Sequence, residues 1–472
     1  MQAVTDFLLP IVQNINKYLS DYILIFLLLG TGLFYSIRTK FVQVRCFGEG
    51  MKKVFGNITL KGGKRKGGLS SFQSLATAIA AQVGTGNIVG ACGAILIGGP
   101  GAIFWMWVIA FFGMATIYAE AVLAQETKIV KEDGSVLGGP VYYIRRAFNN
   151  KFGKFLAGFF AVAIILALGF MGSMVQSNSI SEAISSAAGN TDLAWVVGLI
   201  LAALCTFIFI GGIQRIASVA EKIVPIMAVL YLVLGMIVLG FNITKIPETF
   251  AMIFKYAFMP QALLGGAFGA GIKAAISQGA KRGLLSNEAG MGSTPHAHAQ
   301  AQVEKPHDQG VVAMIGVFID TFVVLTITAL VVISTLYAGN GPLSTTAGLE
   351  LNAATEAITK ANMMQTAMGK IFGTTAGNIL VAICLTFFAF TTIISWNFFG
   401  KQNVQYLFGK KATLVYSILA IGFIFLGSLF PNDLVWELAD MFNNIMVIPN
   451  VLALVCLSGI VVAAVKTKNK KK

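Results

Sequence analysis

Charged residues are scarce in this chain of 472 residues. Asp, Glu, Lys and Arg make up 11% of it, whereas 56% of the residues are hydrophobic and the mean hydropathy is +0.78. An ordinary soluble domain is about 25% charged, so this composition excludes one. Repeated apolar runs of about 20 residues match the hydrocarbon thickness of a bilayer. We therefore predict an all-α polytopic membrane protein.

Cysteine and histidine are also rare. The five cysteines are odd in number and scattered, mostly within the apolar runs, which indicates neither a disulfide nor a metal framework. His296, His298 and His307 fall in one loop between the predicted spans, and we expect that loop to be solvated. With no histidine in a span and no evident nucleophile–base pair, the sequence gives little support to a membrane-embedded enzyme.

Eleven apolar runs are long enough to cross a bilayer. We place them at residues 20–37, 71–97, 101–126, 155–180, 193–213, 221–241, 261–292, 310–338, 377–397, 411–430 and 443–465. The segment before the first run has no basic start and no clean apolar core. We predict a short interfacial helix there and not a cleavable signal peptide.

The net charge of +14 could indicate a nucleic-acid partner, but the positions of Lys and Arg argue against one. If successive spans alternate in direction, 28 of the 34 lie on one side, in the loops after spans 1, 3, 5, 7 and 9, at the span ends beside those loops, or in the C-terminal tail. Five lie on the opposite side, and Lys273 lies within a span. This asymmetry follows the positive-inside rule. It predicts a multi-pass protein of the plasma (inner) membrane, with the N-terminus outside and the C-terminus in the cytoplasm.

Two spans are interrupted by glycine and polar residues. Span 2 contains "QVGTGN" (82–87), and span 7 contains "GGAFGAGIKAAISQGAKRG" (265–283). Since these spans are five apart, they begin on opposite sides of the membrane, and this pattern predicts an inverted repeat with the binding site at the breaks. The predicted single transmembrane transporter domain (1–472) comprises an extra N-terminal helix and basic cytoplasmic loop (1–70), a first five-helix repeat (71–241), a second five-helix repeat (242–465) and a basic cytoplasmic tail (466–472).

The interruption of span 2 places Gln82, Gly84, Thr85, Gly86 and Asn87 near the middle of the membrane. In hydrocarbon, each freed backbone N–H or C=O costs several kcal/mol unless a partner satisfies it. A break exposes N–H groups at one half-helix and carbonyls at the other, which suits the carboxylate and ammonium of a zwitterion. Close helix packing is the alternative use of such glycines, but it does not need the polar residues. We predict that these five residues bind substrate.

The break in span 7 has two possible positions. Ser277 and Gly279, in "SQG" (277–279), are our candidates for substrate binding, and "FGAG" (268–271) is the alternative position of the break. An ammonium within a membrane is costly. Lys273 is therefore expected to snorkel to the surface or to pair with Asp320 or Glu120. We interpret Glu120 as a clamp on the nearby unwound helix.

Four further stretches resemble the alanine/glycine:cation symporter family, which includes sodium:alanine symporters. They are "GGPGAIFWMWVIAFFGMA" (98–115), "GGPVYYI" (138–144), "RGLLSNEAGMGSTP" (282–295) and "FTTIISW" (390–396). The resemblance covers nearly the whole chain. It implies a leucine-transporter-like fold of five plus five inverted helices with one extra N-terminal helix. It also implies transport of alanine, glycine or both, driven by sodium or sometimes protons.

The resemblance also implies site residues. The "VGTGN" segment (83–87) matches the unwound part of the first core helix, where freed carbonyls bind sodium. A sodium site is expected at the carbonyls of Ala80 and Val83 and the hydroxyls of Thr391 and Thr392, which are hard oxygen ligands. Those hydroxyls could instead bond to carbonyls one turn earlier in their own helix. Phe170, Gln176 and Trp396 are expected to complete the substrate pocket.

From these patterns we predict a secondary active symporter that imports small neutral amino acids, alanine or glycine, with sodium by alternating access. No cofactor is expected beyond the coupling ion, and the expected partners are the amino acid, the ion and the lipid bilayer. Proton coupling is the alternative of the same class. A membrane-embedded enzyme, a channel and a non-transporting receptor are the alternatives of other classes.

Overall fold

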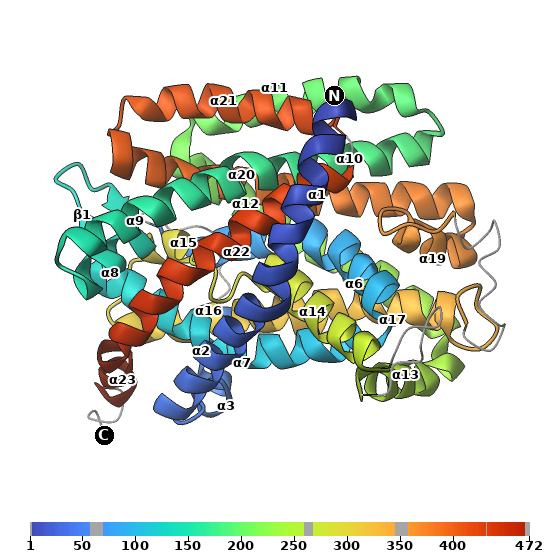
Figure 1. Cartoon of the computed structure of the whole chain (residues 1–472), viewed down its shortest axis with the longest axis horizontal. Coiled ribbons are helices and arrows are strands. Elements are labelled where there is room, and N and C mark those ends of the chain that lie inside the picture. The colour runs from blue at the N-terminus through green and yellow to red at the C-terminus, as the bar shows by residue number, and fades with distance from the viewer. Residues whose placement is uncertain (1, 57–68, 259–267, 345–356, 431, 468–472) are drawn as a thin grey trace.

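The computed structural model describes all residues except 1, 57–68, 259–267, 345–356, 431 and 468–472. Most of its long helices lie side by side, as Figure 1 shows. Within the described part, eight helical stretches are long and apolar enough to cross a membrane, and a ninth span is formed by the pair Ser71–Gln82 and Gly86–Gly98, which bends by 47°. The prediction of a polytopic helical membrane protein is confirmed. The count of eleven spans stays a prediction.

The first half of the chain forms α1 (Gln2–Tyr18), η1 (Leu19–Leu24), α2 (Ile25–Arg38), α3 (Val42–Arg45), α4 (Phe47–Phe55), α5 (Ser71–Gln82), η2 (Gly86–Gly90), α6 (Ala91–Gly98), α7 (Gly101–Thr127), β1 (Ile129–Val130), β2 (Val136–Leu137), α8 (Pro140–Ala147), α9 (Lys151–Ile164), η3 (Ile165–Gly172), α10 (Ser173–Ala188), η4 (Thr191–Leu193), α11 (Ala194–Ile210) and α12 (Gly212–Phe241). The strands pair antiparallel, with Ile129 opposite Leu137. The N-terminal helix does not end before span 1 but continues through η1 into α2.

The second half forms η5 (Ile243–Lys245), α13 (Ile246–Phe258), α14 (Phe268–Asn287), α15 (Pro295–Ala299), α16 (Pro306–Val317), η6 (Phe318–Leu325), α17 (Thr326–Val332), η7 (Ile333–Tyr337), α19 (Met363–Phe372), α20 (Thr374–Phe408), α21 (Ala412–Gly427), α22 (Asn432–Cys456) and α23 (Ser458–Thr467). Predicted spans 8 to 11 fall on these helices. The start of span 7, with Gly265 and Gly266, lies outside the described residues.

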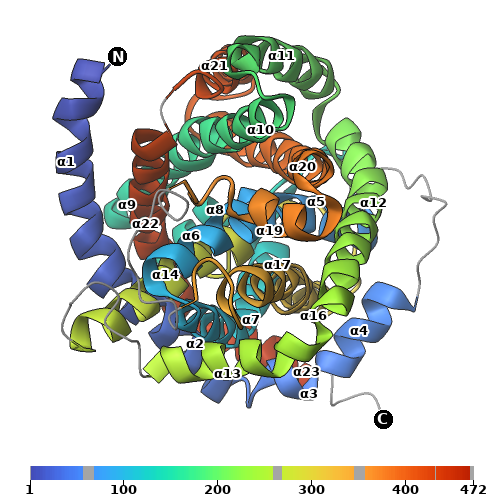
Figure 2. The same cartoon turned by 90° about the vertical axis from the view of Figure 1, so that its right-hand side faces the viewer.

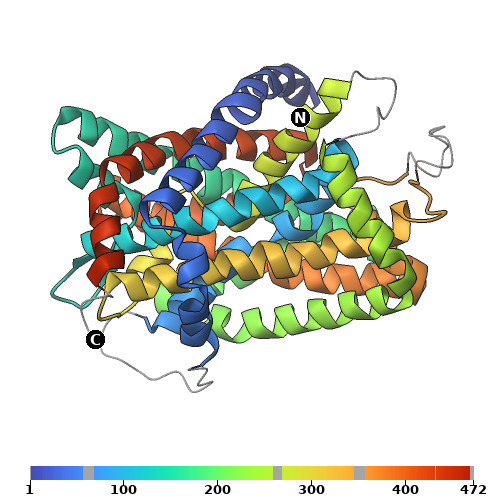
Figure 3. The ribbon, with the colours of Figure 1, turned by 90° about the horizontal axis from the view of Figure 1, so that it is seen from below.

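The interrupted helices lie in the interior of the bundle. Seen along the helices in Figure 2, α5 and α6 lie inside a ring that includes α10, α20, α12, α16, α7 and α22. Helix α14 is buried from Gly279 to its end. The N-terminal helix α1 lies outside this ring and packs against α22. In Figures 1 and 3, α8, α15 and α23 lie toward one end of the bundle, and α13 and α19 lie at the other.

The first interruption follows from local chemistry. Helix α5 begins at a capping box, in which the Ser70 hydroxyl accepts from the Gln73 N–H and the Gln73 side chain accepts from the Ser70 N–H, both at 3.1 Å. It ends at Gln82 because Val83 leaves the helical region, with φ −80° and ψ 88°. The chain becomes helical again at Gly86.

Neither predicted position of the second break is correct. Helix α14 is unbroken through 268–271 and 277–279. It stops after Asn287, and the next seven residues, 288–294, turn with positive φ at Glu288, Gly290 and Gly292 before α15. Gly279 serves close packing instead, because a Cβ there would lie 2.6 Å from the Trp105 Cβ of α7.

Candidate functional site

The groups freed at the first break are bonded by side chains from other helices. The Gly84 N–H donates to Asn87 Oδ1 (2.9 Å), and the Thr85 N–H donates to Oε1 of Gln176 on α10 (3.1 Å). The Asn87 amide in turn donates to the Asp320 carboxylate on η6 (2.6 Å). The side chains of Thr85, Asn87 and Asp320 are completely buried. Four of the five residues predicted for this break, from Gly84 to Asn87, lie in the non-helical turn or directly after it.

The second break is held by Glu120 of α7. Its carboxylate accepts from the N–H groups of Gly290 (3.1 Å) and Gly292 (2.9 Å), and from the side chain of Asn450 (2.6 Å). Asn450 also donates to the Gly290 carbonyl (2.9 Å). Glu120 therefore clamps an unwound segment, but its partner is the break in span 7 and not the break in span 2.

The two breaks meet each other. The Gln82 side chain at the end of α5 donates to the Asn287 carbonyl at the end of α14 (2.7 Å). Gly86 lies against the backbone of Ser286, where a Cβ would lie 3.1 Å from Cα. Residues from opposite halves of the chain thus form one polar centre. Ser277 is buried in α14 about 13 Å along the helix axis from Ser286, and Gly279 contacts α7.

Asp320 completes this centre with a carboxylate. Its oxygens accept from Asn87, from the Ser286 hydroxyl (2.9 and 3.1 Å) and from the Thr321 hydroxyl (2.8 Å). An acid within an apolar span is a signal for function. In the sequence analysis, Asp320 is named as a possible partner for Lys273. Lys273 instead donates to the Tyr22 hydroxyl (2.9 Å) and lies over its ring, so the predicted pairing with Asp320 or Glu120 is wrong.

The two threonines of α20 differ. The Thr392 hydroxyl lies 2.9 Å from the Ala80 carbonyl, 3.4 Å from that of Ala81 and 3.0 Å from that of Phe388. One hydroxyl proton cannot serve three acceptors, so this is an oxygen-rich cluster that joins α20 to the end of α5. The Thr391 hydroxyl bonds only to its own helix and to the Met227 sulfur among the described residues.

Two of the three residues predicted to complete the substrate pocket lie at the breaks: Gln176 at the first and Trp396 at the second. The Trp396 indole donates to the Glu288 carboxylate (2.5 Å), and Gly172 packs on its ring, where a Cβ would lie 2.5 Å from Cζ3. The ring of Phe170 stacks on Phe423 of α21, with centroids 4.6 Å apart. Phe170 therefore makes its ring contacts with α21.

Several buried polar atoms, at the first break and on α20 beside Trp396, have no hydrogen-bond partner among the described residues. They are Oε1 of Gln82, the hydroxyls of Thr85 and Ser395, and both side-chain atoms of the Asn397 amide. Ser395 and Asn397 flank Trp396 on α20. Each such buried atom costs about 1–3 kcal/mol. A polar ligand at the breaks would remove part of this cost.

The three histidines are buried, so the expected solvated loop is wrong. His296 bonds to the Ser293 carbonyl (2.7 Å) and to the Asn403 amide (2.8 Å), and His298 bonds to Gln309 (2.9 Å). His307 bonds to the Tyr118 hydroxyl (2.7 Å). These partners lie up to 189 residues away in the chain, so no local pattern indicates them.

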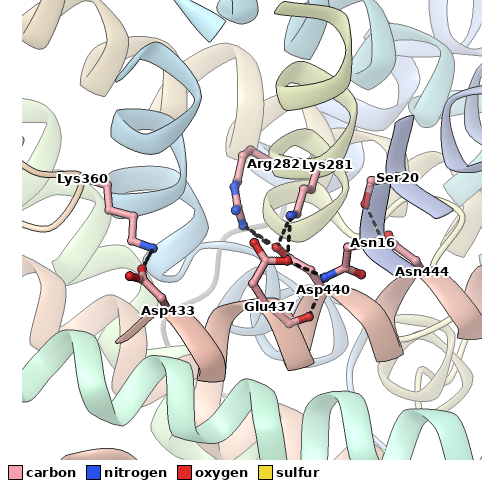
Figure 4. Close-up of polar contacts among 9 residues, drawn as sticks. All are labelled: Asn16, Ser20, Lys281, Arg282, Lys360, Asp433, Glu437, Asp440 and Asn444. Carbon is pink, nitrogen blue, oxygen red and sulfur yellow. Dashed lines mark hydrogen bonds and ion pairs between the residues drawn. The ribbon is translucent and has the colours of Figure 1, made fainter. Parts of the chain in front are cut away.

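Two basic residues of α14, which are counted with the cytoplasmic side in the sequence analysis, are also buried. Figure 4 shows Lys281 and Arg282 turned toward α22, where they meet Asp440 at 2.8 and 3.1 Å. Lys281 also lies 3.7 Å from Glu437, and Asn16 of α1 donates to Glu437 (2.6 Å). These residues form an ionic cluster between α14 and α22. If these two residues are left out of the 28 basic residues counted on the cytoplasmic side, that side still holds most of the Lys and Arg.

The chain segment just before α5 is joined to the segment just after α15 by backbone hydrogen bonds. The Leu69 N–H donates to the Gln300 carbonyl (2.9 Å), and the Gln302 N–H donates to the Leu69 carbonyl (3.0 Å). The side chains of Gln300 and Gln402 both donate to the Val136 carbonyl in β2 (3.0 and 3.3 Å). Lys128 beside them donates to the Ala301 carbonyl (2.7 Å), and burial lowers the pKa of its ammonium. These contacts join β2, the segment before α5 and the segment after α15.

Comparison with known proteins agrees with the geometry. Sodium/alanine symporter AgcS of Methanococcus maripaludis is 39% identical over 98% of this chain and 97% of that protein. Two proteins of Bacillus subtilis are also similar. Putative sodium/proton-dependent alanine carrier protein YrbD is 40% identical over 98% of this chain and 92% of that protein. Probable sodium/glutamine symporter GlnT is 38% identical over 100% of this chain and 92% of that protein.

The fold has a counterpart among solved structures. The crystal structure of MhsT in complex with L-phenylalanine matches 85% of this chain and 93% of that chain, with a TM-score of 0.61 at 13% identity. The leucine-transporter-like fold is therefore confirmed, and the numbers of helices in its repeats stay predictions. A model described as the sodium:alanine symporter family matches residues 5–472. The chain belongs to the sodium:alanine symporter family, whose members are amino-acid symporters and not enzymes.

Proposed function

We propose that this protein imports alanine or glycine together with sodium. The observation that carries this proposal is the meeting of the two broken helices at Gln82–Asn287 and Gly86–Ser286, beside buried polar atoms that have no protein partner among the described residues. A break offers N–H groups to a carboxylate and carbonyls to an ammonium. A free amino acid carries both groups.

The packing around the breaks favours a small substrate. A Cβ on Gly84 would collide with the Thr392 hydroxyl and lie 3.2 Å from Gln176 Oε1. The Trp396 indole, fixed by Glu288 and packed on Gly172, occupies the space over the second break. A substrate with a methyl group or no side chain suits such a site better than a large one. The similar proteins include a probable glutamine symporter as well as alanine carriers, so the pocket must be tested with several amino acids.

Sodium requires hard oxygen ligands, and two places in this centre offer them. The first is the cluster of the Thr392 hydroxyl with the Ala80, Ala81 and Phe388 carbonyls. We favour it over the full predicted set, because Thr391 bonds back to its own helix and no hydrogen bond joins Val83 to this cluster among the described residues. The second is the Asp320 carboxylate with Ser286 and Asn87. A buried carboxylate could hold either sodium or a proton, so Asp320 is also where the alternative of proton coupling would lie.

The ionic cluster between α14 and α22 fits the outer closure of an alternating-access cycle. Lys281 and Arg282 lie on the helix that leads into the second break, and Asp440 lies on a helix of the surrounding ring. Movement of α14 away from α22 must part these charges. A buried charge that loses its partner is strongly unfavourable. The ionic cluster would therefore oppose the separation of α14 from α22 until the binding of substrate and ion offsets this cost.

The test is uptake of labelled alanine and glycine into proteoliposomes, with an inward sodium gradient or with potassium in its place. Accumulation above the outside concentration with sodium only supports the proposal. Accumulation driven only by a pH gradient would replace sodium by protons and make Asp320 the first residue to change. Equilibration without accumulation would indicate a channel, and binding without uptake a receptor.

A further inference from the structure

A second polar cluster lies outside the transport site, where α4 packs against α16. Cys46 precedes α4, Glu49 lies in its first turn, and His307 lies in the first turn of α16. One ligand atom from each residue lies within 4.8 Å of the other two. His307 Nε2 is 3.5 Å from the Glu49 carboxylate. Cys46 and His307 are buried, whereas the Glu49 side chain is 25% exposed and gives the cluster access to solvent.

These three residues supply the ligand types that zinc prefers, namely thiolate, imidazole and carboxylate. In a tetrahedral zinc site the ligand atoms lie about 3.3–3.6 Å apart. The His307–Glu49 distance of 3.5 Å already fits this value, and no other separation must shorten by more than about 1.5 Å. A water molecule can take the fourth position on the exposed side of Glu49.

The surroundings of the cluster favour a cation over a plain ion pair. The other ring nitrogen of His307, Nδ1, is held by the Tyr118 hydroxyl of α7 at 2.7 Å, and a metal-binding histidine typically has such a contact. Lys53, the nearby base on α4, is paired with Asp308 at 3.1 Å and is thereby neutralised. With the Cys46 proton released to solvent, one thiolate and one carboxylate balance a divalent ion.

We propose that Cys46, Glu49 and His307 form a site for a divalent transition-metal ion of the zinc class. The ion fastens the helix α4, which follows span 1, to the first turn of α16. The chain enters α16 soon after it leaves the second broken helix, with α15 and a short loop between them. The site is separate from the residues proposed for alanine and sodium, and it does not depend on their role.

The experiment titrates the purified full-length protein in detergent with cobalt(II) as the probe, followed by zinc competition. A cobalt–thiolate charge-transfer band that saturates at one equivalent is expected. The band is lost in Cys46→Ser. The zinc affinity falls at least about 10-fold in Glu49→Gln and His307→Asn, and about 10-fold in Tyr118→Phe, which removes only the contact that orients His307. Cys456→Ser is the matched control, since Cys456 is the one exposed cysteine.

The results separate the site from its alternatives. No saturable band in the wild-type protein, or a band that persists in Cys46→Ser, would overturn the proposal and leave Glu49–His307 as an ion pair. A band that disappears in Cys456→Ser would overturn it as well. If Cys46→Ser does not give a monodisperse protein, Glu49→Gln decides the question, because an unchanged zinc affinity there contradicts the site. Sodium-driven uptake measured in metal-free buffer should be the same in Glu49→Gln as in wild type, so failure here is distinct from failure of the transport proposal.

Discussion

Adjacent threonines on α20 allow a matched test of the sodium site. The Thr392 hydroxyl reaches the Ala80 carbonyl at 2.9 Å and so joins α20 to the first break, whereas the Thr391 hydroxyl reaches the Phe387 and Phe388 carbonyls of its own helix at 3.0 Å. If sodium binds in the Thr392 cluster, Thr392→Ala removes an oxygen ligand. Thr391→Ala removes only an internal helix bond.

The expected magnitude follows from the charge of the ligand. A polar contact to a charged group contributes about 1.5–3 kcal/mol, and each 1.4 kcal/mol is a factor of ten. Thr392→Ala should therefore raise the sodium concentration for half-maximal alanine uptake about 10- to 100-fold. Thr391→Ala should raise it less than about threefold, because a bond within one helix contributes about 0.5 kcal/mol.

The assay is initial alanine uptake into proteoliposomes over a range of sodium concentrations, with thermal unfolding to exclude a folding defect. Thr392→Ser, which keeps the hydroxyl, should restore most of the sodium affinity. Equal shifts in Thr391→Ala and Thr392→Ala, or an unchanged sodium dependence in Thr392→Ala, would refute the assignment of the ion to this cluster.

Three further predictions concern packing, charge and pocket size. Gly84→Ala should abolish uptake, because its Cβ collides with the Thr392 hydroxyl, whereas Gly422→Ala, where a Cβ meets nothing within 4 Å, should transport normally; equal uptake in the two variants would contradict the close approach. Asp440→Asn should lower the free energy of unfolding by about 3 kcal/mol, whereas Asp433→Asn, whose side chain is 74% exposed, should lower it by less than about 1 kcal/mol; thermal unfolding in detergent measures both, and a similar small loss in each would mean that the ionic cluster is not tightly coupled. Trp396→Ala should admit larger amino acids while the sodium dependence stays close to that of wild type; competition of alanine uptake by leucine and phenylalanine measures this, and unchanged selectivity would refute a capping role for the indole.

The first break could be found from the sequence because its signal is local. Polar residues between glycines in the middle of an apolar run are energetically costly in a membrane, and a binding site explains why they are there. The structure interrupts the helix at this point. The second break was misplaced because glycine has two uses in a membrane helix. Gly279 permits close packing on α7, whereas the actual turn uses Gly290 and Gly292, which lay at the end of the predicted span.

Other features depend on partners far away in the chain. Lys281 and Arg282 are counted on the cytoplasmic side in the sequence analysis, because nothing near them in sequence neutralises their charge; Asp440, 158 residues after Arg282, does so. The role of Glu120 as a clamp was predicted, but its target could not be, because its partner glycines are 170 and 172 residues away. The difference between Thr391 and Thr392 depends on which face of α20 meets α5, and a single sequence does not determine that contact.

Reciprocal binding tests the central claim most directly, because that claim places substrate and ion together where the two broken helices meet. Calorimetric titration of the purified protein with alanine, in sodium and in potassium, gives the factor by which sodium raises the alanine affinity; titration with sodium, with and without alanine, gives the converse factor. The two factors must be equal by linkage, and we predict a factor of about 10 or more, which Thr392→Ala should reduce. Alanine affinity that is the same in sodium and in potassium would contradict the account.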